Sequence, residues 1–168
     1  LLNTPLAERL SEAAVAAGGG MPAELQHGYC MVWLGSAAEA QTKLAALADR
    51  AETDVERARI ATLRGHNTYW TLRQPTSAEA ILDEAEATVA DPLARRILAA
   101  QRASFHADLG RPSAAVRMAD TALSGPLPDE DGALASWAKV GGLALLGRVA
   151  ELGTAAALGQ TAATVAPN

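Results

Sequence analysis

The sequence has very little cysteine and lysine. Cys30 is the single cysteine among 168 residues, so no disulfide can form within the chain. One unpaired cysteine fits a reducing compartment, and we expect a cytoplasmic location. Twelve of the fourteen basic residues are arginine, but the net charge is −5. The chain therefore lacks the basic footprint of a nucleic-acid-binding domain, and we expect no direct DNA binding by these residues.

Long apolar runs and catalytic signatures are also missing. No stretch approaches the roughly 20 apolar residues that span a bilayer, so no membrane partner is expected. Charges at Glu8, Arg9 and Glu12 interrupt the N-terminal segment 6–17, unlike the apolar core of a signal peptide. The patterns GxxxxGK[ST], GxSxG and HExxH do not occur. We therefore expect a non-catalytic chain that binds no cofactor of its own.

Strand-forming residues are scarce, whereas alanine, the strongest helix former, occurs 40 times. This composition predicts an all-α fold. Similar residues recur every 37 positions, and a fixed period of 20–50 residues is typical of a helical solenoid. One column of this repeat contains only small residues, which predicts close approach of helix backbones: Cys30, Asn67, Ser104 and Gly141. A second column is predicted to be buried beside it: Trp33, Trp70, Ala107 and Ala144.

Each repeat is predicted to contain two helices joined by a short break. The spacing of apolar residues predicts these helix pairs: about 22–34 with 37–51, 54–73 with 76–90, 92–109 with 112–124 and 129–146 with 149–165. In the second helices, pairs spaced by seven residues are predicted to share one face: Ala40 with Leu47, Ala80 with Ala87, Ala115 with Ala122, and Leu152 with Gly159. Asp54 and Asp91-Pro92 are helix-start signals. Glycine after the last apolar residue of a first helix favours a left-handed C-cap, at Gly35, Gly110 and Gly147.

These repeats predict one helical-repeat domain over residues 1–168. Residues 1–20 are interpreted as the orphan second helix of a preceding repeat, followed by repeats at 21–53, 54–91, 92–126 and 127–168. The missing initiator methionine and the uncharged last helix suggest a fragment of a longer solenoid. The alternative is a processed chain with an N-terminal cap helix. An apolar terminal repeat would also suit self-association.

The tetratricopeptide pattern is Trp-x2-Leu-Gly-x2-Tyr, then Ala-x6-Ala, then Pro. Residues 137–144 fit three of its first four letters, and Ala80, Ala87 and Pro92 fit its second half. The chain therefore resembles tetratricopeptide proteins over about residues 21–165, although its period is 37 residues instead of 34. The resemblance implies a right-handed α-α superhelix of about nine helices, with the first helices lining its concave face.

Three segments resemble the helical-repeat region of large ATP-binding LuxR-type transcriptional regulators: WLGSAAEAQ, WTLRQPTSAEAILDEAEA and HADLGRPSAAVRMADTAL. That resemblance implies a domain that receives a small-molecule inducer or a protein partner and relays the signal. ATP binding and DNA binding would belong to modules outside these residues. The alternative is a free-standing scaffold that binds a peptide or protein.

If the first helices line a concave groove, two rows of residues would face a ligand. His27, Arg64 and Gln101 form one row, with Arg64 and Gln101 as polar groups. The other row comprises Met31, Thr68 and Phe105, with Asp108 a turn further on. Met31 and Phe105 would supply an apolar floor to the groove. The alternative is that these residues only pack or face water. His27 and Cys30 are spaced like two metal ligands, but no further ligands accompany them, so no metal site is expected.

Overall fold

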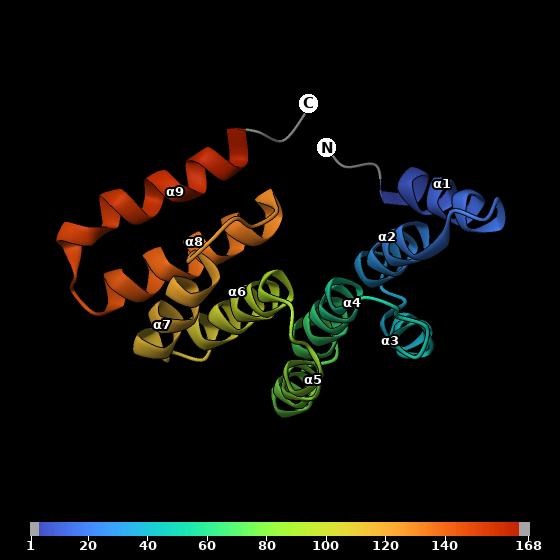
Figure 1. Ribbon diagram of the computed structural model, residues 1–168, viewed down its shortest axis with the longest axis horizontal. Helices are drawn as coiled ribbons and strands as arrows, with labels where there is room; N and C mark the ends of the chain where they lie inside the picture. Colours follow the sequence, from blue (N-terminus) through green and yellow to red (C-terminus); the bar gives the residue numbers. More distant parts are fainter. Residues whose placement is uncertain (1–3, 165–168) are drawn as a thin grey trace. The chain divides into compact units, whose positions relative to one another are not determined.

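The computed structural model describes residues 4–164, and within them the chain forms α-helices and no strand (Figure 1). The all-α prediction is therefore confirmed. The helices are α1 (Thr4–Ala16), α2 (Gly20–Trp33), α3 (Ala37–Ala48), α4 (Asp54–His66), α5 (Pro75–Thr88), α6 (Pro92–Asp108), α7 (Pro112–Ala122), α8 (Asp129–Leu145) and α9 (Leu152–Thr164). None of the helices in this range has both the length and the apolar character needed to cross a membrane.

The chain forms two compact units, residues 1–89 and residues 90–168. In the first unit each helix contacts the next one, and α2 also contacts α4. In the second unit α6 contacts both α7 and α8, and α8 contacts α7 and α9. Each unit therefore stacks the first helix of one repeat on the first helix of the next. This is the contact pattern expected of helix–turn–helix repeats.

The starts of the helices follow the local sequence. Thr53 Oγ1 accepts the Glu56 backbone N–H at 3.2 Å, and the Glu56 carboxylate accepts the Thr53 N–H at 3.0 Å. This capping box places Thr53 as the N-cap, and α4 begins at the predicted Asp54. Asp91 Oδ1 accepts the backbone N–H groups of Leu93 and Ala94, and Pro92 occupies the first turn, so α6 begins as predicted.

The breaks between paired helices use a left-handed residue. Gly35, Gly110 and Gly147 have φ values of 90°, 66° and 70°, which confirms the predicted C-caps. In the second repeat Arg73 takes this place with φ 57°, although it is not glycine. There the helix ends in a π-helical segment, η1 (Asn67–Thr71).

The π-helical segment adds one residue to the second repeat. The Leu72 N–H donates to the Asn67 carbonyl, five residues back, at 3.0 Å. In the first repeat the corresponding Leu34 N–H donates four residues back, to Cys30. Leu34 and Leu72 are accordingly 38 residues apart, whereas Leu72 and Leu109 are 37 apart. The repeat period is therefore not constant along the chain.

The core of each unit is built largely from small side chains. In the first unit Leu44, Leu47 and Ile60 form one buried cluster. In the second unit the clusters contain several fully buried alanines, including Ala103, Ala119 and Ala138. Alanine permits close approach of helix backbones and loses no side-chain entropy on burial. The alanine-rich composition is thus also a packing feature.

Ala80 and Ala87, which are predicted to share one face of α5, are both exposed. The residues that α5 buries are Ala78 and Leu82, and α5 contacts α4. Pro75 occupies the first turn of α5.

The small column is misplaced in the last repeat. A Cβ added at Gly141 would meet nothing within 4 Å, whereas one at Gly142 would lie 2.8 Å from Val116 Cγ2. Gly142 is therefore the residue at which α8 approaches α7. Cys30, Asn67 and Ser104 are buried, as the column predicts.

Candidate functional site

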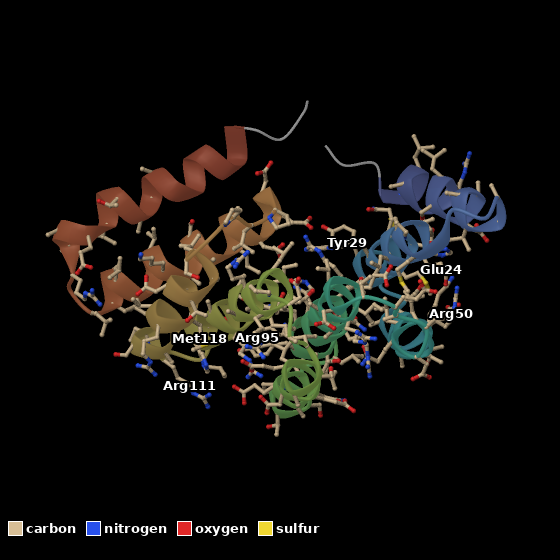
Figure 2. All side chains as sticks on the ribbon, viewed as in Figure 1. Glu24, Tyr29, Arg50, Arg95, Arg111 and Met118 are labelled. Atoms are coloured by element: carbon tan, nitrogen blue, oxygen red, sulfur yellow. The ribbon has the colours of Figure 1, made fainter. Side chains whose placement is uncertain are left out.

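The first unit carries a row of aromatic rings on its first helices, here called the aromatic row, of which two are exposed and two are half-buried. It comprises Tyr29 and Trp33 of α2, His66 at the end of α4, and Trp70 of η1. Successive ring centroids are 6.0 Å, 5.9 Å and 6.5 Å apart. Trp33 is 58% exposed and Tyr29 is 44% exposed, so two large rings face solvent. Figure 2 shows Tyr29 on α2, away from the Glu24–Arg50 ion pair that joins α2 to the end of α3.

Local helix geometry explains how the row forms. Tyr29 and Trp33 are four residues apart, as are His66 and Trp70, and residues at this spacing are neighbours on a helix surface. The contact of α2 with α4 then brings Trp33 against His66. Tyr69, which is buried, supports Trp70 edge-on with ring centroids 4.6 Å apart. Two adjacent repeats thus contribute to one continuous surface.

The π-helical segment η1 is anchored beneath the row. Asn67 is fully buried, and its Nδ2 donates to the Ala37 carbonyl of α3 at 2.8 Å. This bond ties η1 to the first residue of the preceding second helix. π-Helical turns occur frequently at functional sites.

The aromatic row carries no charge near neutral pH. Burial lowers the pKa of His66 below its usual value, because the charged imidazolium loses hydration in the helix interface. Trp33 and Trp70 have no ionisable group. The row can therefore offer ring faces and hydrogen-bond donors, but no ionic contact.

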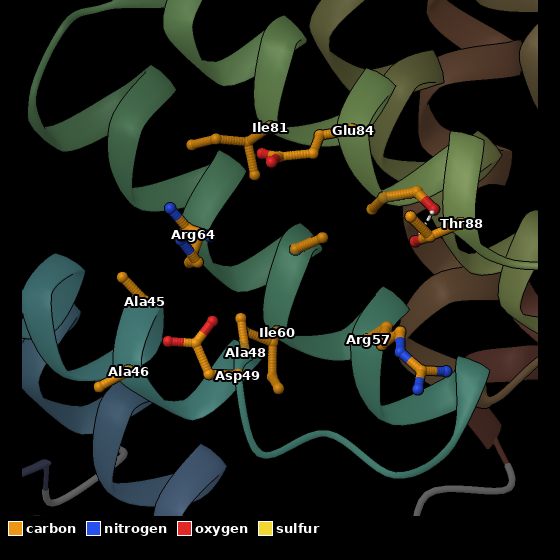
Figure 3. Close-up of a pocket in the computed structure, with 12 residues that line it drawn as sticks. Ala45, Ala46, Ala48, Asp49, Arg57, Ile60, Arg64, Ile81, Glu84 and Thr88 are labelled. Atoms are coloured by element: carbon orange, nitrogen blue, oxygen red, sulfur yellow. Dashed lines mark hydrogen bonds between the residues drawn. The ribbon is translucent and has the colours of Figure 1, made fainter.

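A second feature of the first unit is a hollow bounded by α3, α4 and α5, with a volume of about 510 Å³ (Figure 3). Its lining is mostly alanine and isoleucine, with four charged residues and one threonine: Ala45, Ala46, Ala48, Asp49, Arg57, Ile60, Ala61, Arg64, Ile81, Glu84, Ala85 and Thr88. A volume of this size falls in the range of small-molecule sites. The hollow involves both second helices of the first unit, α3 and α5.

The two arginines of the hollow differ in their contacts. Arg57 donates to Asp54 at 2.8 Å and to the Ala51 carbonyl at 3.2 Å. Arg64 is half-buried, and its buried Nε–H has no hydrogen-bond partner among the described residues. An unpaired guanidinium N–H is costly to bury, so Arg64 is the polar group of the hollow best placed to accept a ligand.

The predicted groove residues of the first unit lie in different environments. Met31 is buried with Val32 and Ala40, and Thr68 is buried in η1. His27 is half-buried, and its Nδ1 accepts from Lys43 Nζ at 3.4 Å. Met31 and Thr68 thus pack inside the unit and do not form the floor of an open groove. Arg64 reaches a concave surface, but it is the hollow shared with α3 and α5.

In the second unit the predicted groove residues also lie in different environments. Gln101 and Phe105 are 5% and 1% exposed, so neither is available to a ligand in this conformation. Gln101 Nε2 donates to Ser104 Oγ, one turn along α6, at 3.1 Å. Asp108 is exposed at the end of α6. The alignment of the two rows across all repeats stays a prediction.

The sequence did contain a signal for the aromatic row. Tyr29 and His66 share one column of the repeat, and Trp33 and Trp70 share another. We interpreted the tryptophan column as buried, but Trp33 is largely exposed and Trp70 is only half-buried. The change from aromatic residues in the first two repeats to alanine and valine in the later ones would have indicated a surface specific to the first unit.

No metal centre is found among the described residues, where no three His, Cys, Asp or Glu side chains are grouped to hold an ion. Cys30 is buried, and the Gln26 amide donates to its sulfur at 3.7 Å. No protein-family model matches the sequence, and the comparisons with curated proteins and with solved structures gave no match either.

Proposed function

We propose that this chain is a non-catalytic binding module and that the aromatic row holds a segment of a protein partner. The observation that carries the proposal is the exposure of Trp33 and Tyr29 within a continuous row of rings. Tryptophan and tyrosine are enriched at interface hot spots, where they bury large apolar area and still donate a hydrogen bond. Contiguous exposed apolar surface of this kind typically marks an interaction site.

The resemblance to LuxR-type regulators gives this binding a role. In such a parent protein the module would act in the cytoplasm, and occupancy of the first-helix face would be the signal relayed along a right-handed superhelix. ATP binding and DNA binding would belong to other modules. In a free-standing scaffold the same row would recruit the partner without a relay.

The hollow favours a second candidate function, the sensing of a small-molecule inducer that bears a carboxylate. Arg64 would pair with the carboxylate, while the half-buried Ile81 and Ala45 contact the apolar part. Thermal denaturation of the purified chain with a panel of small carboxylates tests this. A ligand that raises the melting temperature of wild type but not of Arg64→Met supports it. A shift that persists in Arg64→Met contradicts it.

The proposed function is tested by selecting peptides from a random library against the purified chain. Selected peptides should bind Trp33→Ser at least about tenfold more weakly than wild type, because the variant removes a central ring. Trp137→Ser is the matched control, since Trp137 lies on α8 and is 57% exposed. Peptides that bind both variants as tightly as wild type would show that the row is not the working surface.

A further inference from the structure

We infer that the hollow bounded by α3, α4 and α5 binds a small zwitterion, an amino acid or short peptide with a free amino group and a free carboxylate. This inference deepens the second candidate function, the sensing of a small carboxylate, and rests on it. Three observations lead to it: charged side chains without partners, their opposite signs around one hollow, and the ends of two helices beside them.

Three of the four charged side chains around the hollow have no partner. Arg64 of α4 leaves its buried Nε–H without an acceptor, and the Asp49 and Glu84 carboxylates form no hydrogen bond or ion pair with any described residue. The fourth, Arg57, is paired with Asp54 at 2.8 Å. Figure 3 shows that the three unpartnered side chains come from three different helices. A ligand in the hollow therefore meets charged groups that the fold itself leaves unpaired.

The three unpartnered groups carry opposite charges. The Arg64 guanidinium is a cation, whereas Asp49 and Glu84 are acidic, and the guanidinium forms no salt bridge with either of them. A ligand placed among them can thus contact both signs at once. Hydrogen bonds between an ammonium and a carboxylate, or between a carboxylate and a guanidinium, are roughly twice as strong as those between neutral groups.

The ends of two helices also favour an ammonium group. The lining residues of α3 run from Ala45 to Asp49, which are its last turn and its C-cap. The lining residues of α5 end at Thr88, the last residue of that helix. The C-terminus of a helix carries a partial negative charge that stabilises a nearby cation. Both helix ends therefore act in the same direction as the two acidic side chains.

A ligand with a single charge would complement only part of the hollow. A simple carboxylate could pair with Arg64 but would bring a third negative charge beside Asp49 and Glu84. A simple amine would leave the buried Arg64 Nε–H without an acceptor, and an unsatisfied buried donor costs free energy. A zwitterion supplies an acceptor for the guanidinium and a cation for the carboxylates.

The size and lining of the hollow indicate the rest of the ligand. Its volume of about 510 Å³ is sufficient for a small molecule. The half-buried side chains of Ala45, Ile81 and Ala85 offer apolar surface beside the charged groups. An aliphatic side chain on the ligand would cover this surface. Leucine and leucyl-leucine are therefore suitable probes.

The experiment measures binding of both probes to the purified chain by isothermal titration calorimetry. Their N-acetyl and C-amide derivatives are the matched ligand controls, because each derivative loses one charge. We expect saturable binding of at least one free probe, weakened at least about tenfold in both of its derivatives. Arg64→Met should weaken binding at least about tenfold, as should Asp49→Asn combined with Glu84→Gln. Glu39→Gln, an exposed change in the first turn of α3, should bind as wild type.

Several results would overturn the inference. If neither free probe gives saturable heat at millimolar concentration, the hollow is not a zwitterion site. Equal binding of the free and N-acetyl probes would contradict a role for the acidic side chains, while the second candidate function would stand. Binding unchanged by Arg64→Met would place the ligand elsewhere and refute both. The two replaced carboxylates are exposed, and circular-dichroism melting curves would show that the double variant remains folded.

Discussion

Gly141 and Gly142 are adjacent in α8 but should respond in opposite ways to the same substitution. A Cβ at Gly142 would lie 2.8 Å from Val116 Cγ2 and 3.0 Å from the Pro112 carbonyl oxygen. Neither neighbour yields readily, since Val116 is buried and β-branched and the Pro112 oxygen belongs to the backbone. At Gly141 nothing lies within 4 Å of the added atom.

The magnitude follows from two opposing effects. Replacing a helical glycine by alanine gains about 1 kcal/mol in helix propensity at either position. At Gly142 overpacking against α7 costs about 1–3 kcal/mol, which cancels or exceeds that gain. Gly141→Ala should therefore stabilise the chain, and Gly142→Ala should leave it neutral or destabilise it. The free energies of unfolding of the two variants should differ by about 1–3 kcal/mol.

Urea denaturation followed by circular dichroism measures this difference directly. Thermal melting gives a second reading, at about 2–4 °C per kcal/mol for a chain of this size. Each variant is the other's control, because both make the same chemical change one residue apart. Equal shifts of both variants would refute the close approach of α8 to α7 at Gly142, and with it the corrected position of the small column.

Two further predictions concern the first unit. Because the pKa of His66 is lowered by burial, the unfolded chain binds this proton more readily than the folded chain. The free energy of unfolding should therefore fall as the pH drops below about 6.5. His66→Gln should remove the contribution of His66 to this decrease, which denaturation curves measured between about pH 7.5 and pH 5.5 would show. Asn67→Ala should cost about 1–3 kcal/mol by leaving the buried Ala37 carbonyl without its 2.8 Å donor, and an unchanged urea midpoint would contradict the anchoring of η1 to α3.

The helices and their ends could be predicted because their causes are local. Asp91-Pro92 and the glycines at 35, 110 and 147 act within a few residues of themselves, and the structure uses all of them as expected. The packing face of α5 could not be obtained by adding a fixed period. The second repeat is one residue longer, and a shift of one residue moves a side chain about 100° around a helix.

The candidate groove was predicted less well, because exposure depends on which helices lie on either side. Met31 and Phe105 are adjacent to the small column, and that position faces the interior. The same repeat column that holds exposed Tyr29 in the first unit holds fully buried Ala103 in the second. Side-chain size alone therefore misleads, since large apolar residues were assigned to the core and remain partly at the surface.

The irregular segment and the exposed rings support the same assignment. A regular repeat would end its first helix with four-residue hydrogen bonds, as Leu34 and Leu109 do. The second repeat departs from this rule only at η1, where Asn67 is held by α3 and Trp70 completes the aromatic row. A wide helical turn in contact with the row that holds the exposed Trp33 is what the proposed function expects, because π-helical turns occur frequently at functional sites.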